Sequence, residues 1–183
     1  IGEKAPAGAY YLVSVLDGEL NFVHGIPYFA VSIAEIVDGQ VVSGVIYNPS
    51  TSDLYFAEKG NGAFKEGYRN HERLRVSARK DLALALIAAD SIYSPSVAAT
   101  RSFGSISLDL ANLASGKVDG VISFDNDAAD IAAGGLLVRE AGGQVFAKGQ
   151  KDIRTAELGK VLVEGNVIAA NAELGKNLFA IVK

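Results

Sequence analysis

The segment LDGELNFVHGIPYFAVSIA, residues 16–34, decides the fold of this chain. It connects a mostly apolar run, residues 10–16, to a second mostly apolar run, residues 29–36. Runs of this length that are rich in aromatic and β-branched residues are typical of buried strands, and the pair Asp17-Gly18 is typical of a turn. The segment therefore predicts a strand that ends at an acidic turn and a second strand that follows it.

The same pattern continues downstream and predicts an antiparallel sheet. Residues 41–47 and 54–58 form two further runs of strand length. Asp38-Gly39 is a hairpin signal between the second and third runs, and residues 48–53 are a cluster of turn formers. We expect four strands that follow one another as an antiparallel meander.

Helical periodicity appears in the second half of the chain. Ile106, Leu110 and Leu113 recur at helical spacing, and Gly116 is a suitable end for that helix. Further elements are expected as a strand at 118–124, a helix at 131–141 with Asp130 as its candidate cap and Gly142-Gly143 as its end, a strand at 167–170, and a helix from 172 to about 182. Strands first and alternating strands and helices later indicate a layered α/β fold.

Composition excludes several classes of function. The 183 residues include no Cys and only His24 and His71, so thiol chemistry and Cys- or His-rich metal sites are excluded, and any metal must bind through oxygen. A net charge of −4 and a pI near 5.2 argue against direct binding of nucleic acid or anionic membranes, which need excess Lys and Arg. No apolar run reaches the roughly 18 residues that a membrane span needs.

Common nucleotide and nucleophile motifs fail at defined positions. Residues 60–65 place Lys65 where a dinucleotide fingerprint needs its third Gly, which excludes a Rossmann site. The Gly-Lys pairs at 116–117 and 175–176 lack the other residues of a phosphate-binding P-loop. The chain also has no Gly-x-Ser-x-Gly nucleophile elbow, so it does not match the serine hydrolases that use one.

The remaining candidates are acidic residues beside backbone turns, namely Glu3, Asp17, Glu19 and Asp130. Hard cations such as Mg²⁺ prefer carboxylate oxygens, and a helix N-terminus presents amide hydrogens to a phosphate. Each acid also has a structural alternative: Glu3 as a solvated end residue, Asp17 as part of a plain turn, and Asp130 as a helix cap. Acting together, they favour metal-assisted phosphoryl chemistry.

The order and surroundings of these acids resemble the inositol monophosphatase family. Residues 16–34 are similar to the family signature Asp-Pro-(Ile/Leu)-Asp-Gly-Thr-x-Asn-Phe, which is followed by a Pro and a Ser-Ile strand. Other similar segments are residues 44–49, 54–55, 60–64, 104–105, 108–110, 130–134, 140–143 and 169–171. Residues 1–3 are similar to the family's Gly-Glu-Glu loop, so the resemblance covers essentially the whole chain.

The resemblance implies an α/β fold, the five-layer αβαβα sandwich of inositol monophosphatases and fructose-1,6-bisphosphatases. Because the chain opens at Ile1, we expect the first two family helices to be absent. One phosphatase domain, residues 1–183, is expected, with lobes at about 1–90 and 91–183. The resemblance further implies a dimeric, cytoplasmic, Li⁺-sensitive enzyme that binds two or three Mg²⁺ ions. It would hydrolyse small phosphorylated substrates by direct attack of metal-activated water.

The resemblance also assigns roles to individual residues. The metal ligands carried over are Glu3, Asp17, Asp130 and the Leu16 carbonyl. The catalytic residues carried over are Glu3, Asp17 and Glu19, with the phosphate on the amides of Gly18 and Glu19. Substrate contacts are expected from Gly18, Glu19, Gly104, Ser105 and Ser123.

Several positions depart from the family pattern, among them Ala128-Ala129, which replaces the usual aromatic residue just before Asp130. Ser14 replaces the first Asp of the signature, which is a ligand shared between metals, and Val15 replaces its Pro. The loss of one anion beside a divalent cation removes on the order of several kcal/mol of attraction at an effective dielectric constant near 20. Glu19 replaces the Thr that positions the attacking water. Lys4 replaces the second acid of the Gly-Glu-Glu loop, and Ser123 replaces a Glu that contacts a sugar hydroxyl.

Two alternatives to an inositol-1-phosphate phosphatase therefore stay open. One is a catalytically impaired pseudoenzyme that serves as a regulatory or binding module, because some bacterial family members are associated with RNA polymerase and ribosomal RNA transcription. The other is a relative that acts on fructose 1,6-bisphosphate or on a nucleotide 3′-phosphate. Ser14 and Glu19 favour the module, whereas Glu3, Asp17 and Asp130 favour chemistry.

Overall fold

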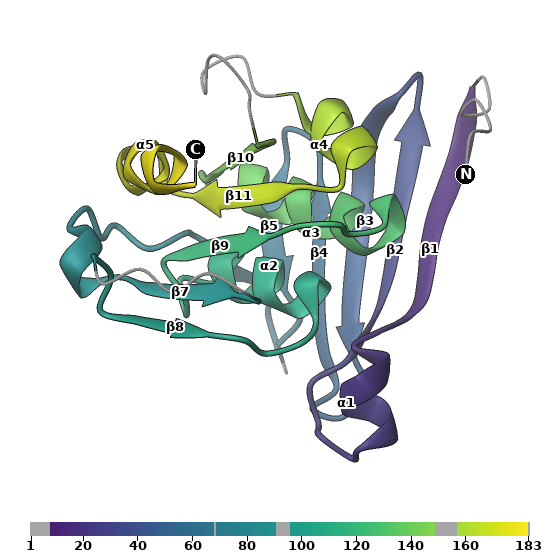
Figure 1. Cartoon of the computed structure of the whole chain (residues 1–183). Helices are drawn as coiled ribbons and strands as arrows, with labels where there is room; N and C mark the ends of the chain where they lie inside the picture. Colours follow the sequence, from purple (N-terminus) through teal and green to yellow (C-terminus); the bar gives the residue numbers. More distant parts are fainter. Residues whose placement is uncertain (1–7, 68, 91–95, 149–156, 183) are drawn as a thin grey trace.

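Two β-sheets with helices between and beside them form the molecule (Figure 1). The computed structural model describes residues 8–67, 69–90, 96–148 and 157–182. The larger sheet contains β1 (Ala9–Asp17), β2 (Ala30–Val37), β3 (Gln40–Asn48), β4 (Asp53–Glu58), β5 (Gly62–Lys65) and β6 (Glu72–Arg73), in chain order and antiparallel. The predicted four-strand meander is confirmed, and β5 and β6 extend it.

The hairpin between β2 and β3 forms for the reason that its sequence predicts. Val37 pairs with Gln40, so Asp38 and Gly39 are the two loop residues, and both have positive φ, at 49° and 75°. Two positive φ angles in a two-residue loop match the turn whose twist fits antiparallel strands, and Asp-Gly is a favoured pair for it. This turn fixes the register of the sheet.

The smaller sheet is mixed, with strand order β10-β11-β9-β7-β8. Its members are β7 (Leu86–Ala89), β8 (Ala99–Arg101), β9 (Gly120–Ser123), β10 (Gln144–Phe146) and β11 (Val167–Ala170). Strand β7 pairs in parallel with β8 and β9, whereas β11 pairs antiparallel with β9 and β10. The sequence predicted β9 and β11, but it gave no signal for β7, β8 and β10, which have only three or four residues each.

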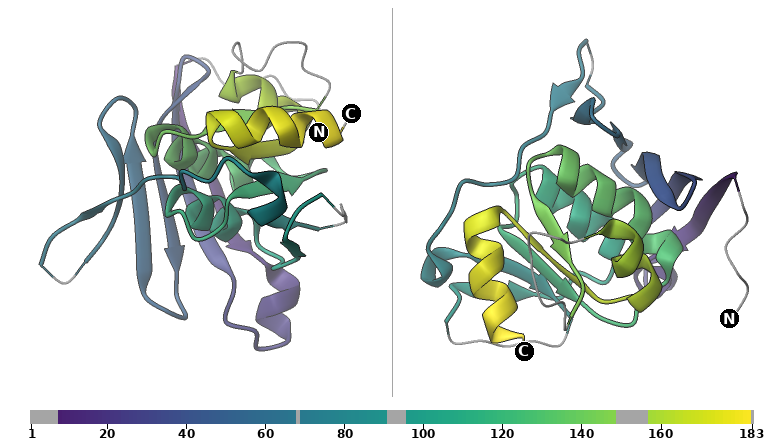
Figure 2. Two further views of the ribbon diagram at one scale, coloured as in Figure 1. Left: turned by 90° about the vertical axis from the view of Figure 1, so that its left-hand side faces the viewer. Right: turned by 90° about the horizontal axis from the view of Figure 1, so that it is seen from above.

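Helices fill the space between the sheets and cover the smaller one (Figures 1 and 2). Helix α2 (Ile106–Ala114) packs on α3 (Ala128–Glu140), and α3 contacts strands of both sheets. Helix α4 (Leu158–Glu164) packs beside α3, while α5 (Ala172–Ile181) and the 3₁₀ turn η1 (Leu82–Leu84) lie on the outer side of the smaller sheet. The described residues thus build a sheet, a helical layer, a second sheet and a second helical layer. None of the described helices is long and apolar enough to cross a membrane.

The outer face of the larger sheet carries a row of apolar side chains. Val13 pairs with Ile33, Ile33 with Val45, and Val45 with Phe56, so these residues lie side by side across four strands. Val13, Ile33 and Val45 are 49%, 39% and 37% exposed, and no described helix covers them. The fifth layer of the expected sandwich is not among the described residues.

One local expectation was wrong and another was incomplete. Helix α3 begins at Ala128 with Asp127 as its N-cap residue, so Asp130 lies inside the first turn and is not the cap. Asp17-Gly18 is more than a turn, because Gly18 is the N-cap residue of a short helix, α1 (Glu19–Val23). Five residues are too few to show a helical period, which explains why the sequence pattern missed α1.

A hydrogen-bonded link holds the segment after α1 against α2. The Tyr28 hydroxyl donates to Asp109 at 2.6 Å, and the Asn112 amide donates to the same hydroxyl at 2.9 Å. Asp109 is only 4% exposed. Burial raises the pKa of Asp109 to about 7 against the pull of the Tyr28 hydrogen bond, and the charges of Asp90 and Asp17 raise it further.

Small residues let α3 approach its neighbours closely. A Cβ added at Gly134 would lie 2.6 Å from the Leu110 Cβ, and one added at Gly44 would lie 2.8 Å from the Ala133 Cα. These distances leave no room for a methyl group, so both glycines are needed for packing on the core helix.

We predict that Gly134→Ala lowers the free energy of unfolding by about 1–3 kcal/mol, because the new methyl group forces α2 and α3 apart. The matched control is Gly159→Ala, since a Cβ at Gly159 meets only the Gly39 carbonyl at 3.6 Å. In that helical position Ala should raise stability by about 0.5–1 kcal/mol. Urea denaturation measures both, and equal effects of the two substitutions would contradict the packing argument.

The raised pKa of Asp109 predicts that the stability of the chain depends on pH. Between pH 3.8, the usual Asp pKa, and about 7, the folded state retains a proton on Asp109 that the unfolded chain has released. The free energy of unfolding should therefore fall as the pH rises through this window, and Asp109→Asn should reduce the slope. A residual slope of the same sign is expected, because the pKa values of Asp17 and Asp130 are also raised. Urea denaturation at several pH values in this window measures the slope of the free energy of unfolding against pH. An unchanged slope in Asp109→Asn would refute the raised pKa of Asp109.

Candidate active site

The turn after β1 brings Asp17 to the start of α2. Gly18 has a positive φ of 90°, and a Cβ there would lie 2.9 Å from the Tyr28 carbonyl oxygen and 3.1 Å from that of Gly104. Only Gly fits this close approach without strain. The Asn21 amide donates to the carbonyls of Tyr28 and Phe103, at 2.8 and 2.7 Å, and so fastens α1 to the segment before α2.

The Asp17 carboxylate is buried and accepts two hydrogen bonds from the start of α2. The Ser105 hydroxyl and the Ser107 backbone amide both donate to its Oδ2 atom at 2.7 Å. Asp17 is 8% exposed, and burial raises the pKa of its carboxyl, although these hydrogen bonds oppose the shift. Ser105 also caps α2, since its hydroxyl accepts from the Leu108 amide at 3.4 Å. Ser105 and Ser107, at the start of α2, therefore fix the orientation of the Asp17 side chain.

Asp130 approaches the same place from the first turn of α3. Ser107 connects the two helices, because its hydroxyl donates to the Asp130 backbone carbonyl at 2.8 Å. Burial raises the pKa of the Asp130 carboxyl, a hydrogen bond with the Ser14 side chain lowers it, and the negative charge of Asp17 raises it further. Two acids that are far apart in sequence thus lie close enough to repel each other.

A cavity of about 310 Å³ opens at this pair of acids. Its described lining comprises Asp17, Asp90, Gly104, Ser105, Ile106, Asp125, Asn126, Asp127 and Asp130. Five of these residues are Asp and none is Lys or Arg, so the cavity has a strongly negative lining. Asp90 and the segment 125–127 were not among the predicted site residues, because they belong to no motif and lie in loops after β7 and β9.

The structure brings some predicted residues together and leaves others apart. Gly104 and Ser105 line the cavity beside Asp17, and Gly18 lies against Gly104. Glu19 is exposed at the start of α1, and its charge raises the pKa values of Asp17 and Asp130. Leu16 precedes Asp17 on β1, next to a register shift between Ser14 and Asp17.

Two further predicted residues have different outcomes. Ser123 lies behind the cavity, where its buried hydroxyl is 2.8 Å from an Asp90 carboxylate oxygen and 3.0 Å from the Asn126 amide oxygen. It therefore positions two lining residues. Glu3 lies outside the described residues.

The donor set suits Mg²⁺ by chemical type. Within the described parts of the chain, no group of three or more His, Cys, Asp or Glu side chains is arranged to hold a metal ion. Asp17 and Asp130 nevertheless supply two carboxylates in one cavity, and Mg²⁺ in proteins is commonly held by one or two carboxylates, waters and substrate phosphate. Ser14, beside Asp130, offers a neutral hydroxyl where a third anion would strengthen the site.

Comparison with known proteins identifies the family of this chain. The model of the inositol monophosphatase family matches residues 16–183. Inositol-1-monophosphatase of Rhizobium meliloti is 39% identical over 198 residues, which cover 98% of this chain and 70% of the relative. Nus factor SuhB of Escherichia coli K12 is 35% identical over 188 residues, which cover 93% of this chain and 66% of the relative.

A solved structure extends the match to three dimensions. The extragenic suppressor protein suhB from Bartonella henselae superposes with a TM-score of 0.85 at 40% identity, and the match covers 96% of this chain and 73% of that one. The family model and these relatives span the loop with Asp17, the start of α2 and the first turn of α3. The chain belongs to the inositol monophosphatase family.

Proposed function

We propose that the cavity at Asp17 and Asp130 is a Mg²⁺-dependent phosphomonoesterase centre of the inositol-1-monophosphatase type. The observation that carries this proposal is the meeting of these two buried or half-buried acids beside the start of α2. A bound divalent cation would offset the repulsion between their negative charges. The family membership of the chain and the name of its Rhizobium meliloti relative support the same chemistry.

In this proposal each residue has a defined task. Asp17, held by Ser105 and Ser107, and Asp130, held on α3, would bind the cation together with the Leu16 carbonyl and Glu3. Gly18 and Glu19 would present backbone amides to the phosphate, with Gly104 and Ser105 beside them. Bound Mg²⁺ would polarise the phosphate oxygens and lower the pKa of the attacking water.

The reaction then needs no covalent enzyme intermediate. Water attacks the phosphorus atom directly, the bond from phosphorus to the ester oxygen breaks, and the alcohol leaves with a proton. Two or three ions, Li⁺ sensitivity, a homodimer and a cytoplasmic location stay predictions from the family resemblance. Ser14 and Glu19 lead us to expect weaker activity than in a member with the complete signature.

The negative lining of the cavity favours a substrate with one phosphate group. A second phosphate, as in fructose 1,6-bisphosphate, would meet Asp90, Asp125 and Asp127 with no Lys or Arg among the described lining residues. A polyol presents hydroxyl donors that these carboxylates accept. We therefore rank inositol 1-phosphate above fructose bisphosphate.

A regulatory module is the second candidate. Two observations favour it: the 35% identity to Escherichia coli Nus factor SuhB, and the neutral Ser14 beside Asp130. In this alternative the fold is retained for association with RNA polymerase or the ribosomal RNA transcription apparatus, and phosphate release is absent. The enzyme and module proposals differ in whether the purified chain turns over a phosphomonoester.

We predict that Asp17→Asn and Asp130→Asn each abolish Mg²⁺-dependent phosphate release from inositol 1-phosphate, because each removes the charge of one proposed Mg²⁺ ligand. Colorimetric phosphate release at millimolar Mg²⁺ measures this. Asp38→Asn in the exposed β2–β3 turn is the matched control and should retain full activity, since Asn also adopts positive φ. Turnover by both acid variants at the wild-type rate would rule out this centre, and an inactive wild type would favour the module.

We predict that Ser14→Asp increases phosphate release at least tenfold, because it restores an anion next to Asp130. A tenfold change corresponds to about 1.4 kcal/mol in the activation barrier. Without Mg²⁺ the same substitution should lower the melting temperature, since it adds a third negative charge at a buried position. Ser14→Asn supplies a neutral control of the same size. If Ser14→Asp and Ser14→Asn have equal activity and equal Mg²⁺-dependent melting shifts, the missing anion is not the defect.

A further inference from the structure

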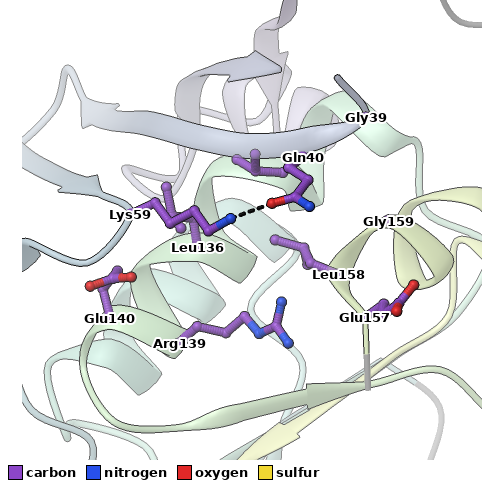
Figure 3. Close-up of a pocket in the computed structure, with 10 residues that line it drawn as sticks. Gly39, Gln40, Lys59, Leu136, Arg139, Glu140, Glu157, Leu158 and Gly159 are labelled. Carbon is purple, nitrogen blue, oxygen red and sulfur yellow. Dashed lines mark hydrogen bonds between the residues drawn. The ribbon is translucent and has the colours of Figure 1, made fainter. Parts of the chain in front are cut away.

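Two cavities lie at opposite ends of α3, and they differ in how their polar groups are paired. In the cavity of about 440 Å³ at the last turn of α3, Lys59 donates a hydrogen bond to Gln40 across the opening (Figure 3). The Glu140 carboxylate beside them accepts from two backbone amides at 2.8 and 2.9 Å. The cavity at Asp17 and Asp130, which we name the acid cavity, is different, because one buried donor behind it serves two acceptors.

That donor, Ser123, lies beside Asp90 at the carboxyl ends of two neighbouring parallel strands. Ala89 on β7 pairs with Ile122 on β9, and Asp90 and Ser123 come directly after them in the chain. Ligands of α/β sheets commonly bind just beyond the carboxyl ends of such strands. Asp90 is exposed there and lines the acid cavity, whereas Ser123 is 4% exposed behind it.

The Ser123 hydroxyl has one hydrogen and two acceptor oxygens within reach. Its oxygen lies 2.8 Å from Asp90 Oδ2 and 3.0 Å from Asn126 Oδ1. The orientation of Asn126 is fixed, because its backbone and side-chain amides both donate to the Gly165 carbonyl oxygen at 2.9 Å. A carboxylate attracts the hydroxyl hydrogen more strongly than a neutral amide oxygen does, so the Asn126 oxygen is left to accept from another donor.

The Asp90 carboxylate has acceptor capacity beyond its bond with Ser123. An ionised carboxylate offers about four acceptor positions, and the Ser123 hydrogen occupies one. Asp90 and Asn126 both line the acid cavity together with Asp17 and Asp130. One side of this cavity therefore presents acceptor oxygens to the part of a ligand that extends away from the acid pair. Hydroxyl groups are donors that suit them.

We propose that Asp90 and Asn126 determine specificity for the alcohol part of the substrate by accepting hydrogen bonds from its hydroxyl groups. This inference rests on the proposed phosphatase function of the acid cavity. Ser123 is then a positioning residue that holds Asp90, and the contact that the family resemblance gives to a Glu at position 123 passes to Asp90. Phosphomonoesters of polyols are favoured over phosphates of plain alcohols.

Two substrates that share a six-membered carbon ring test this proposal. Cyclohexyl phosphate lacks the ring hydroxyls of inositol 1-phosphate, so the ratio of their kcat/KM values measures hydroxyl recognition. Asp90→Ala should lower this ratio at least tenfold, or about 1.4 kcal/mol, while kcat/KM for cyclohexyl phosphate stays within twofold. Ser123→Ala should lower the ratio about threefold. Asp38→Asn removes one negative charge in the exposed β2–β3 turn and should leave the ratio unchanged.

A binding measurement separates this inference from the proposed phosphatase function, because it needs no turnover. Saturation-transfer NMR of the full chain at millimolar Mg²⁺ should give a stronger signal for myo-inositol than for cyclohexanol. Asp90→Ala should lose at least threefold of the myo-inositol signal at an unchanged melting temperature. If the wild type hydrolyses neither substrate and Asp90→Ala still loses this signal, the phosphatase proposal fails and the hydroxyl contact stands.

The inference is overturned by either of two results with Asp90→Ala. In an active chain, the contradicting result is an unchanged ratio or an equal loss of kcat/KM for both substrates. In an inactive chain, it is a myo-inositol signal equal to that of the wild type.

Discussion

Two hydrogen bonds to the Asp17 carboxylate connect the larger sheet to the helical layer, and the site depends on them. A charged carboxyl that leaves water needs such bonds, because an unpaired buried charge is strongly destabilising. Ser105 and Ser107 supply them from the start of α2, and the close contact of Gly18 with Gly104 brings the two segments within reach. Ser107 then connects α2 to the first turn of α3 through the Asp130 carbonyl. A single buried acid thus organises three segments that are distant in the chain.

The acid pair reduces the stability of the folded chain. Burial raises the pKa values of both Asp17 and Asp130, and the charge of Asp17 raises the pKa of Asp130 further. Asp109 is a further buried acid, and the charge of Asp17 raises its pKa too. Sites that conflict with stability in this way are typical of function, because a bound ligand supplies the missing compensation. The hydroxyl of Ser14 offsets part of the repulsion at Asp130 but adds no charge for a cation.

The sequence predicted most of the sheet and the helical core, because these parts have clear local signals. The Asp38-Gly39 turn and the apolar runs around it identify β1 to β4, and the Gly- and Ala-rich segment from Asp130 identifies α3. Strands of three or four residues such as β7 and β10 carry too few residues for a pattern. The Asp130 error arose because an Asp before an apolar run is a common cap, whereas α3 begins earlier, at Ala128, with Asp127 as its N-cap residue.

The acidic lining formed by Asp90, Asp125 and Asp127 was not predictable from the sequence, because no local pattern indicates it. Asp90 and Asp125 lie in loops, and only the packing of β7 beside β9 brings them to one cavity. Ser123 contacts this lining through Asp90 and Asn126, at a position where the family resemblance has a Glu.

Anomalous diffraction from crystals soaked in Mn²⁺, as a substitute for Mg²⁺, tests the central claim most directly. The account predicts a peak in the cavity within about 2.3 Å of one carboxylate oxygen of Asp17 and one of Asp130, distances close to those of Mg²⁺ and its oxygen ligands. A Mn²⁺ ion that binds elsewhere on the chain, or that contacts only one of the two acids, would contradict it.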